Sequence, residues 1–182
     1  MTQWKKVLAH GALAGSLSSL LSCAVLAIAG RRQTGSAAAP LNAVSHWYWG
    51  DEALHQQRTD LTHTALGYLT HHGASVFWAT TYAALSRNRP LLHTTPGIVL
   101  GAVATSATAC LADYQITPHR LTPGFEHRLS SGALLGVYAA FAVGLAAGAL
   151  ALRDQYPEKD DAGEVKADEA PPVIRRVRAG HA

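Results

Sequence analysis

Charge is scarce in this chain, and its scarcity is the first constraint on the fold. Only 15% of the 182 residues are Asp, Glu, Lys or Arg, whereas soluble domains carry about 25%. The few charges lie between four long stretches that are almost free of them. The net charge of +3 is scattered and forms no basic patch of the kind that binds nucleic acid. The composition therefore favours a membrane protein and excludes a nucleic-acid-binding domain.

Cysteine is nearly absent as well. Cys23 and Cys110 both lie inside apolar stretches, and there is no Cys-x-x-Cys motif, which excludes a disulfide framework. The sequence also lacks a nucleophile elbow, a phosphate-binding glycine loop and the order of a catalytic triad. We therefore expect a protein that is not an enzyme, unless a bound metal ion supplies the chemistry.

The four apolar stretches predict transmembrane helices at residues 7–30, 62–85, 96–112 and 130–152. Each has 17 to 24 residues, which is enough to cross a hydrocarbon core of about 30 Å. A cleaved signal peptide is the alternative for the first stretch, because Ala27-Ile28-Ala29 looks like a cleavage site. The length of the stretch favours a retained helix. The sequence thus predicts an all-α integral membrane four-helix bundle over residues 1–154.

Two segments outside these helices have their own character. Trp47, Tyr48 and Trp49 follow one another after the first helix, and Trp and Tyr concentrate at the head-group level of membranes. Residues 41–49 are therefore predicted to form a short interfacial or re-entrant element. Residues 155–182 are rich in charged residues, Pro and Gly, which predicts a disordered tail.

The loops indicate an orientation. The short turn at 86–95 makes the second and third helices antiparallel neighbours. One side of the membrane then carries Lys5, Lys6, Arg87, Arg89 and Arg153, and the other carries Arg31, Arg32, Arg58, Arg120 and Arg128. The two groups are equal in number until Lys159 and Lys166 of the tail are added to the first. The positive-inside rule therefore favours a bacterial inner (plasma) membrane protein with both termini in the cytoplasm.

Small residues recur at every fourth position in three of the helices. The glycines of these series are Gly11, Gly15, Gly97, Gly101, Gly132, Gly136, Gly144 and Gly148. In a bilayer, small residues let helix backbones approach closely, so they mark contact faces. We expect these glycines to pack the bundle, or to bind a membrane-protein partner or a second copy of the chain.

Histidines provide the candidate chemistry. His71 and His72 fall near the middle of the second predicted helix, and His63 lies two turns before His71. Ionisable groups at that depth are functional candidates. The outer side adds His46, His55, Asp113, His119 and His127. Imidazole and carboxylate suit transition metals, so these residues form a candidate metal or haem site. A haem on His71 or His72 would need its second ligand from a dimer.

A structural interpretation competes with this one, because a neutral histidine in a bundle can hydrogen-bond a carbonyl or hydroxyl of a neighbouring helix. Three functions therefore stay open. The leading one is a non-enzymatic structural or accessory subunit of the membrane. The alternatives are a metal- or haem-binding module and a conduit for protons or small solutes.

A resemblance points the same way. The run Asp-Tyr-Gln-Ile-Thr-Pro-His-Arg-Leu-Thr-Pro-Gly-Phe-Glu at 113–126, followed by Leu129, Ser130 and Tyr138, resembles small inner-membrane proteins of proteobacteria. The layout of a histidine-bearing second helix, a glycine-rich third helix and a proline-rich outer loop is similar to that of YagU-type proteins. The resemblance covers the last three helices. It implies a bacterial inner-membrane protein linked to acid or envelope stress, and it transfers no functional residue.

Overall fold

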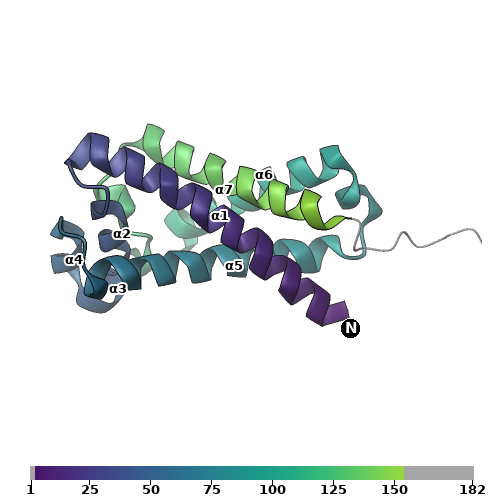
Figure 1. Cartoon of the computed structure of the whole chain (residues 1–182), viewed down its shortest axis with the longest axis horizontal. Coiled ribbons are helices and arrows are strands. Elements are labelled where there is room, and N and C mark those ends of the chain that lie inside the picture. The colour runs from purple at the N-terminus through teal and green to yellow at the C-terminus, as the bar shows by residue number, and fades with distance from the viewer. Residues whose placement is uncertain (1–2, 154–182) are drawn as a thin grey trace, which may run out of the picture.

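Four long helices make up most of the molecule (Figure 1). The structure, a computed structural model, describes residues 3–153, and within this range every regular element is a helix. The long helices are α1 (Gln3–Thr34), α5 (Leu66–Ser86), α6 (Thr95–Leu111) and α7 (Ser131–Leu152). The all-α prediction is confirmed. The predicted disordered tail at 155–182 lies outside the described residues.

Three of these segments are long and apolar enough to cross a membrane: α1, the stretch Thr95–Ile116 that begins with α6, and α7. The helix α5 is not among them, because His71, His72 and several Thr and Ser residues interrupt its apolar sequence. With 32 residues, α1 extends for roughly 48 Å. It is longer than the predicted stretch at 7–30 because the charged residues at both of its ends continue the helix.

The helices begin where side chains cap their free N–H groups. Thr94 Oγ1 accepts a hydrogen bond from the backbone N–H of Gly97, and Ser130 Oγ accepts one from that of Ala133. Such caps stabilise a helix start by roughly 1 kcal/mol. Gln33 at the end of α1 holds the start of α7 in place: its Oε1 accepts from the Ser130 N–H at 2.8 Å, and its Nε2 donates to Ser130 Oγ at 3.1 Å.

The molecule has two unlike ends. The first residues of α1 and the last residues of α7 lie at one end, which we call the terminal end (Figure 1). The turn η2 (Pro90–His93), which joins α5 to α6, belongs to this end. The opposite end, the loop end, consists of residues 35–65 and 112–130. Its short elements are α2 (Ala39–Val44), α3 (His46–Trp49), α4 (Asp51–His55), η1 (Leu61–Ala65), η3 (Ala112–Ile116), η4 (His119–Leu121) and η5 (Phe125–His127).

The helix α1 lies at the centre of the arrangement, because it packs along both α5 and α7, while α6 packs on α7. Glycine permits the close approach. A Cβ on Gly15 would lie 2.6 Å from Val76 Cα on α5, and a Cβ on Gly144 would lie 2.5 Å from Ser18 Cα on α1. Larger residues at these positions would force the helices apart.

The other glycines of the predicted series have varied surroundings. Gly11 faces Thr80 of α5, and Gly148 faces Ala14 of α1. Gly97 lies against the carbonyl of Leu91 in η2, and Gly101 lies against the ring of Tyr82. Gly136 meets only a methyl group of Val25, and Gly132 has no atom within 4 Å of where its Cβ would be. The series therefore mark several kinds of contact, and Gly132 marks none in this chain.

At the loop end, residues 41–49 form parts of α2 and α3. The helix α2 is buried, with Asn42 fully covered, whereas Tyr48 and Trp49 of α3 are half exposed. The side chain of Asn42 holds the loop end together: its Nδ2 donates to the carbonyls of Gln56 and Arg58, and its Oδ1 accepts from Thr64 Oγ1 at 2.6 Å. The short elements of the loop end therefore cover one end of the four long helices.

Candidate functional site

A cavity of about 80 Å³ lies between the long helices, in the half nearest the loop end. Residues of α1, α5, α6 and α7 form its walls, and residues of α2, α3 and the 122–125 segment close it toward the loop end. Because roughly 10–15 Å³ of cavity volume on this measure holds one water molecule, the cavity has room for several waters. It is larger than a second cavity, of about 20 Å³, at the terminal end.

The divergence of α5 and α6 creates this space. The two helices are joined by the short η2 turn at the terminal end, where Gly101 meets the Tyr82 ring. Beyond this point they contact each other only sparsely, because α6 packs on α7 instead. Ser106 illustrates the preference, since its Oγ donates to the Tyr138 carbonyl of α7 at 2.7 Å. The cavity therefore lies where α5 and α6 part.

Aromatic side chains dominate the walls. They are Trp47, Trp78, Phe125, Tyr138 and Phe141, and they come from four different elements. Trp47 is fixed in place, because its indole Nε1 donates to the Thr122 carbonyl at 2.8 Å. A largely apolar wall with a few polar groups is typical of sites that bind small molecules.

His71 is one of the polar groups in the wall. Its Nε2 lies 2.9 Å from Ser22 Oγ on α1. The single hydroxyl hydrogen of Ser22 is directed at the Ser18 carbonyl, 2.7 Å away, so the Ser22 oxygen is left to accept. His71 is then the donor and carries its proton on Nε2. When the ring is neutral, this arrangement leaves its Nδ1 as an acceptor.

Asp113 and Tyr138 form the second polar group. The Tyr138 hydroxyl on α7 donates to Asp113 Oδ2 at 2.6 Å, which is the distance typical of a hydrogen bond to a carboxylate. Asp113 lies in η3, just beyond the end of α6. Glu126 is close enough to interact electrostatically with it. The loop-end half of the cavity therefore has a negative character.

The structure brings only two of the predicted site residues, His71 and Asp113, to this cavity. His72, next in sequence, turns away and stacks on Tyr68 with ring centroids 5.6 Å apart. Asp60 caps η1, directly before α5: its Oδ1 accepts from the backbone N–H of His63 at 2.6 Å, and its Oδ2 lies 3.1 Å from His63 Nδ1. The hydrogen bond from the backbone N–H of His63 is the main cause that lowers the pKa of Asp60.

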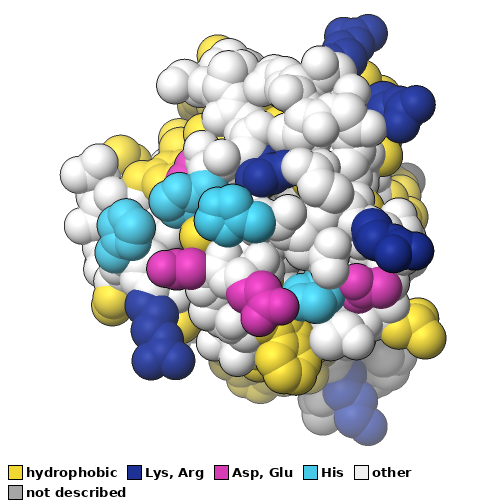
Figure 2. Space-filling model, turned by 90° about the vertical axis from the view of Figure 1, so that its left-hand side faces the viewer, with side chains coloured by type: hydrophobic (Ala, Val, Ile, Leu, Met, Phe, Trp, Pro, Cys, Tyr) yellow, Lys and Arg dark blue, Asp and Glu magenta, His cyan; other side chains and the backbone are white. Residues whose placement is uncertain are grey.

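The remaining predicted residues lie at the loop end, where His and acidic side chains gather on the face shown in Figure 2. His46 is buried and donates from Nδ1 to the Ala43 carbonyl, and His55 does the same to that of Asp51. The rings of His119 and His127 lie 6.0 Å apart. These histidines therefore serve mainly as hydrogen-bond donors to the backbone or as surface groups.

Within residues 3–153, the structure does not gather the predicted metal or haem ligands into one group. Among residues 3–153, no group of three or more His, Cys, Asp or Glu side chains is placed to hold one metal ion. Of the two ring nitrogens of His71, Nε2 is engaged by Ser22.

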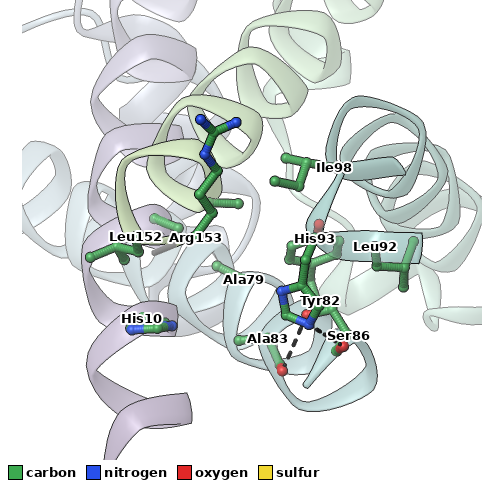
Figure 3. Close-up of a pocket in the computed structure, with 12 residues that line it drawn as sticks. His10, Ala79, Tyr82, Ala83, Ser86, Leu92, His93, Ile98, Leu152 and Arg153 are labelled. Atoms are coloured by element: carbon green, nitrogen blue, oxygen red, sulfur yellow. Dashed lines mark hydrogen bonds between the residues drawn. The ribbon is translucent and has the colours of Figure 1, made fainter. Parts of the chain in front are cut away.

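A second, smaller cavity of about 20 Å³ lies at the terminal end (Figure 3). His10, Tyr82, His93 and Arg153 contribute its polar groups, and the His93 Nε2 donates to the Ser86 carbonyl at 3.1 Å. This space suffices for one water molecule. An apolar cluster that includes Ala79, Phe141 and Leu145 lies between the two cavities, so they do not form one path.

Sequence reasoning missed several residues of the larger site. Ser22 and Tyr138 orient the two polar groups, and Trp47 and Trp78 supply aromatic walls. The spacing of Ser18, Ser22, His71 and Ser75 carries a signal in hindsight, because Ser on one face of an apolar helix indicates a polar contact. Comparison of the chain with protein-family models, with characterised proteins and with solved structures finds no match.

Proposed function

We propose that this protein is a multi-pass protein of the bacterial inner membrane, in which α1, α5, α6 and α7 cross the bilayer as a four-helix bundle. Its function is to bind a small molecule, without catalysis, in the cavity beside His71 and Asp113. It thereby acts as a binding or accessory subunit. The metal- or haem-binding module and the conduit for protons or small solutes stay predictions.

One observation carries the membrane assignment: many large apolar side chains of the long helices face outward, while several serines are buried between the helices. The exposed large apolar residues of the four helices are Leu8, Leu13, Leu20, Leu21, Ile28, Leu69, Phe77, Leu85, Val99, Leu100, Val103, Leu111, Leu135 and Val143. Ser18, Ser19 and Ser22 are fully buried, and Ser75 and Ser106 nearly so. A soluble protein has the opposite distribution, whereas lipid is a good environment for this surface.

This distribution also argues that α5 spans the membrane. Leu69 and Phe77 are each 61% exposed, while Ser75 is buried and His71 lies against Ser22. Its polar residues thus face protein and its large apolar ones face outward. A helix of 21 residues is long enough to cross. The low mean hydropathy of α5 therefore results from polar side chains on the face that points toward the protein.

Both termini are proposed to face the cytoplasm. The terminal end carries Lys5, Lys6, Arg87, Arg89 and Arg153, and Arg87 lies 4.6 Å above the ring of Trp4. Basic residues and an aromatic ring at the membrane edge are typical of the cytoplasmic interface. The loop end, with the cavity, then faces the periplasm.

Cysteine labelling tests this assignment at α5, the long helix that is not among the three candidate spans. In a chain whose two cysteines are replaced by alanine, Gln57→Cys and Asn88→Cys are introduced one at a time, before and after α5. We expect a membrane-impermeant maleimide to label Gln57→Cys in intact cells and Asn88→Cys only after lysis. The reverse pattern would overturn the orientation. Labelling of both from the same side would show that α5 does not cross.

A further inference from the structure

The larger cavity has a composition that selects ligands by charge. Its walls combine five aromatic rings with one carboxyl group, that of Asp113, and no lysine or arginine is among its lining residues. His71 donates from Nε2 to Ser22. Asp113 is the one Asp or Glu among the lining residues, and the charge of its carboxylate is negative.

We infer that the cavity binds a small organic cation, with a methylated ammonium group held among the aromatic rings beside Asp113. This inference rests on the proposed function, because it names the ligand class of the same cavity. The faces of Trp, Tyr and Phe attract cations, and aromatic cages are a known means of recognising quaternary ammonium groups. Such a group cannot donate a conventional hydrogen bond, which suits a wall that is mostly ring.

The placement of the carboxyl group supports a cation rather than a neutral ligand. A carboxylate in apolar surroundings is costly unless it is paired. Tyr138 supplies one hydrogen bond to Oδ2, and no cationic side chain lies in the wall to neutralise the charge. Glu126 adds to the negative potential near Asp113. A bound cation would supply the missing counter-charge.

Access and size agree with this ligand class. The cavity lies near the loop end, where Asp113 follows the end of α6, so on the proposed topology a cation reaches it from the level of the lipid head groups. The volume of about 80 Å³ suits a compact ammonium head and excludes a large dye-like cation. The ammonium group has two sources, a free solute or the head group of a choline lipid.

The test compares choline with 3,3-dimethylbutan-1-ol, its neutral analogue of nearly the same shape. The full chain is placed in nanodiscs of phosphatidylethanolamine and phosphatidylglycerol, which lack choline, and binding is followed by ligand-observed NMR. We expect saturable choline binding at least tenfold tighter than that of the neutral analogue. Asp113→Asn, which keeps an oxygen to accept from Tyr138, should weaken choline binding at least tenfold and leave the analogue unchanged. Glu52→Gln, which removes an exposed loop-end charge, is the control.

Trp78→Leu provides a second variant in case Asp113→Asn does not fold. It should weaken choline binding about three- to thirtyfold, because a ring face is lost, with a smaller effect on the neutral analogue. If both probes bind equally and Asp113→Asn changes neither, the cation inference is wrong and the small-molecule cavity stands. If neither probe binds, both proposals are overturned. Displacement of choline by phosphatidylcholine added to the nanodiscs would identify a lipid head group as the source.

Discussion

Ser22 on α1 accepts a hydrogen bond from His71 on α5, with 2.9 Å between Ser22 Oγ and His71 Nε2. This bond joins two helices whose backbones are brought together by Gly15, about two turns earlier on α1. It fixes the tautomer of the histidine and leaves its Nδ1 as an acceptor. The contact between two buried polar groups thereby sets both the packing of α5 and the chemistry of the cavity.

Replacing Ser22 by alanine should therefore destabilise the protein. The His71 Nε2–H would lose its partner in apolar surroundings, at a cost of about 1 kcal/mol for a bond between membrane helices. Unfolding in mixed micelles of mild detergent and SDS measures the change. Ser16→Ala is the matched control, because Ser16 bonds only to the Ala12 carbonyl of its own helix. Equal effects of the two substitutions would count against a role for the interhelical bond.

The contact between α1 and α7 gives a second prediction. A Cβ on Gly144 would lie 2.5 Å from Ser18 Cα, and a backbone atom cannot rotate away. Gly144→Ala should therefore destabilise by about 1–3 kcal/mol, as overpacking does. Gly132→Ala meets open space and should be neutral or stabilising by up to about 1 kcal/mol, because alanine favours the helix. The same unfolding assay compares them, and a destabilising Gly132→Ala would indicate a partner on that face.

Asn42 gives a prediction for the loop end. In Asn42→Asp, a carboxylate would face the carbonyls of Gln56 and Arg58, to which the amide now donates at 3.0 and 2.9 Å. Losing both donors should cost about 2–3 kcal/mol and should open the 56–60 segment. Hydrogen exchange of that segment would rise in Asn42→Asp and not in Gln57→Ala, whose side chain is exposed. Unchanged exchange in Asn42→Asp would contradict the role of this amide.

Asp60 gives a dependence on pH. The backbone N–H of His63 lowers the pKa of Asp60 below the ordinary value of 3.8, since it stabilises the charged carboxylate. A depressed pKa in the folded state contributes stability above the unfolded value, and this contribution is lost as the pH falls through the folded value. Asp60→Asn keeps a capping oxygen and lacks the charge. It should be less stable than the natural chain at pH 7, and the difference should shrink steadily below about pH 4.

The sequence predicted the long helices well, because their signal is local. The helices predicted at 96–112 and 130–152 are found as α6 (Thr95–Leu111) and α7 (Ser131–Leu152), since Pro96 and the apolar runs mark them directly. The sequence did not predict α2 as a buried helix. The Asn42 side chain can be buried only because groups of Gln56, Arg58 and Thr64 hydrogen-bond to it. Contacts between residues this far apart in the chain produce no periodic pattern in the sequence.

The cavity was predicted only in part for the same reason. His71 and His72 carry the same signal in sequence, yet about 100° of helix rotation separates them, so one faces Ser22 and the other Tyr68. Asp113 was a candidate because it is a carboxylate at a helix end. Its aromatic neighbours come from α3, α5, η5 and α7, and no spacing along the chain reveals that they meet.

The central position of α1 has a consequence for how the protein is made. Of the four long helices described, α1 is synthesised first, and its small-residue faces are covered by α5 and by α7. Ser18, which contacts Gly144, therefore stays exposed to lipid or to a chaperone until α7 has been synthesised. Synthesis interrupted before residue 131 would leave α1 half covered, so quality-control proteases should remove such fragments while sparing the finished bundle.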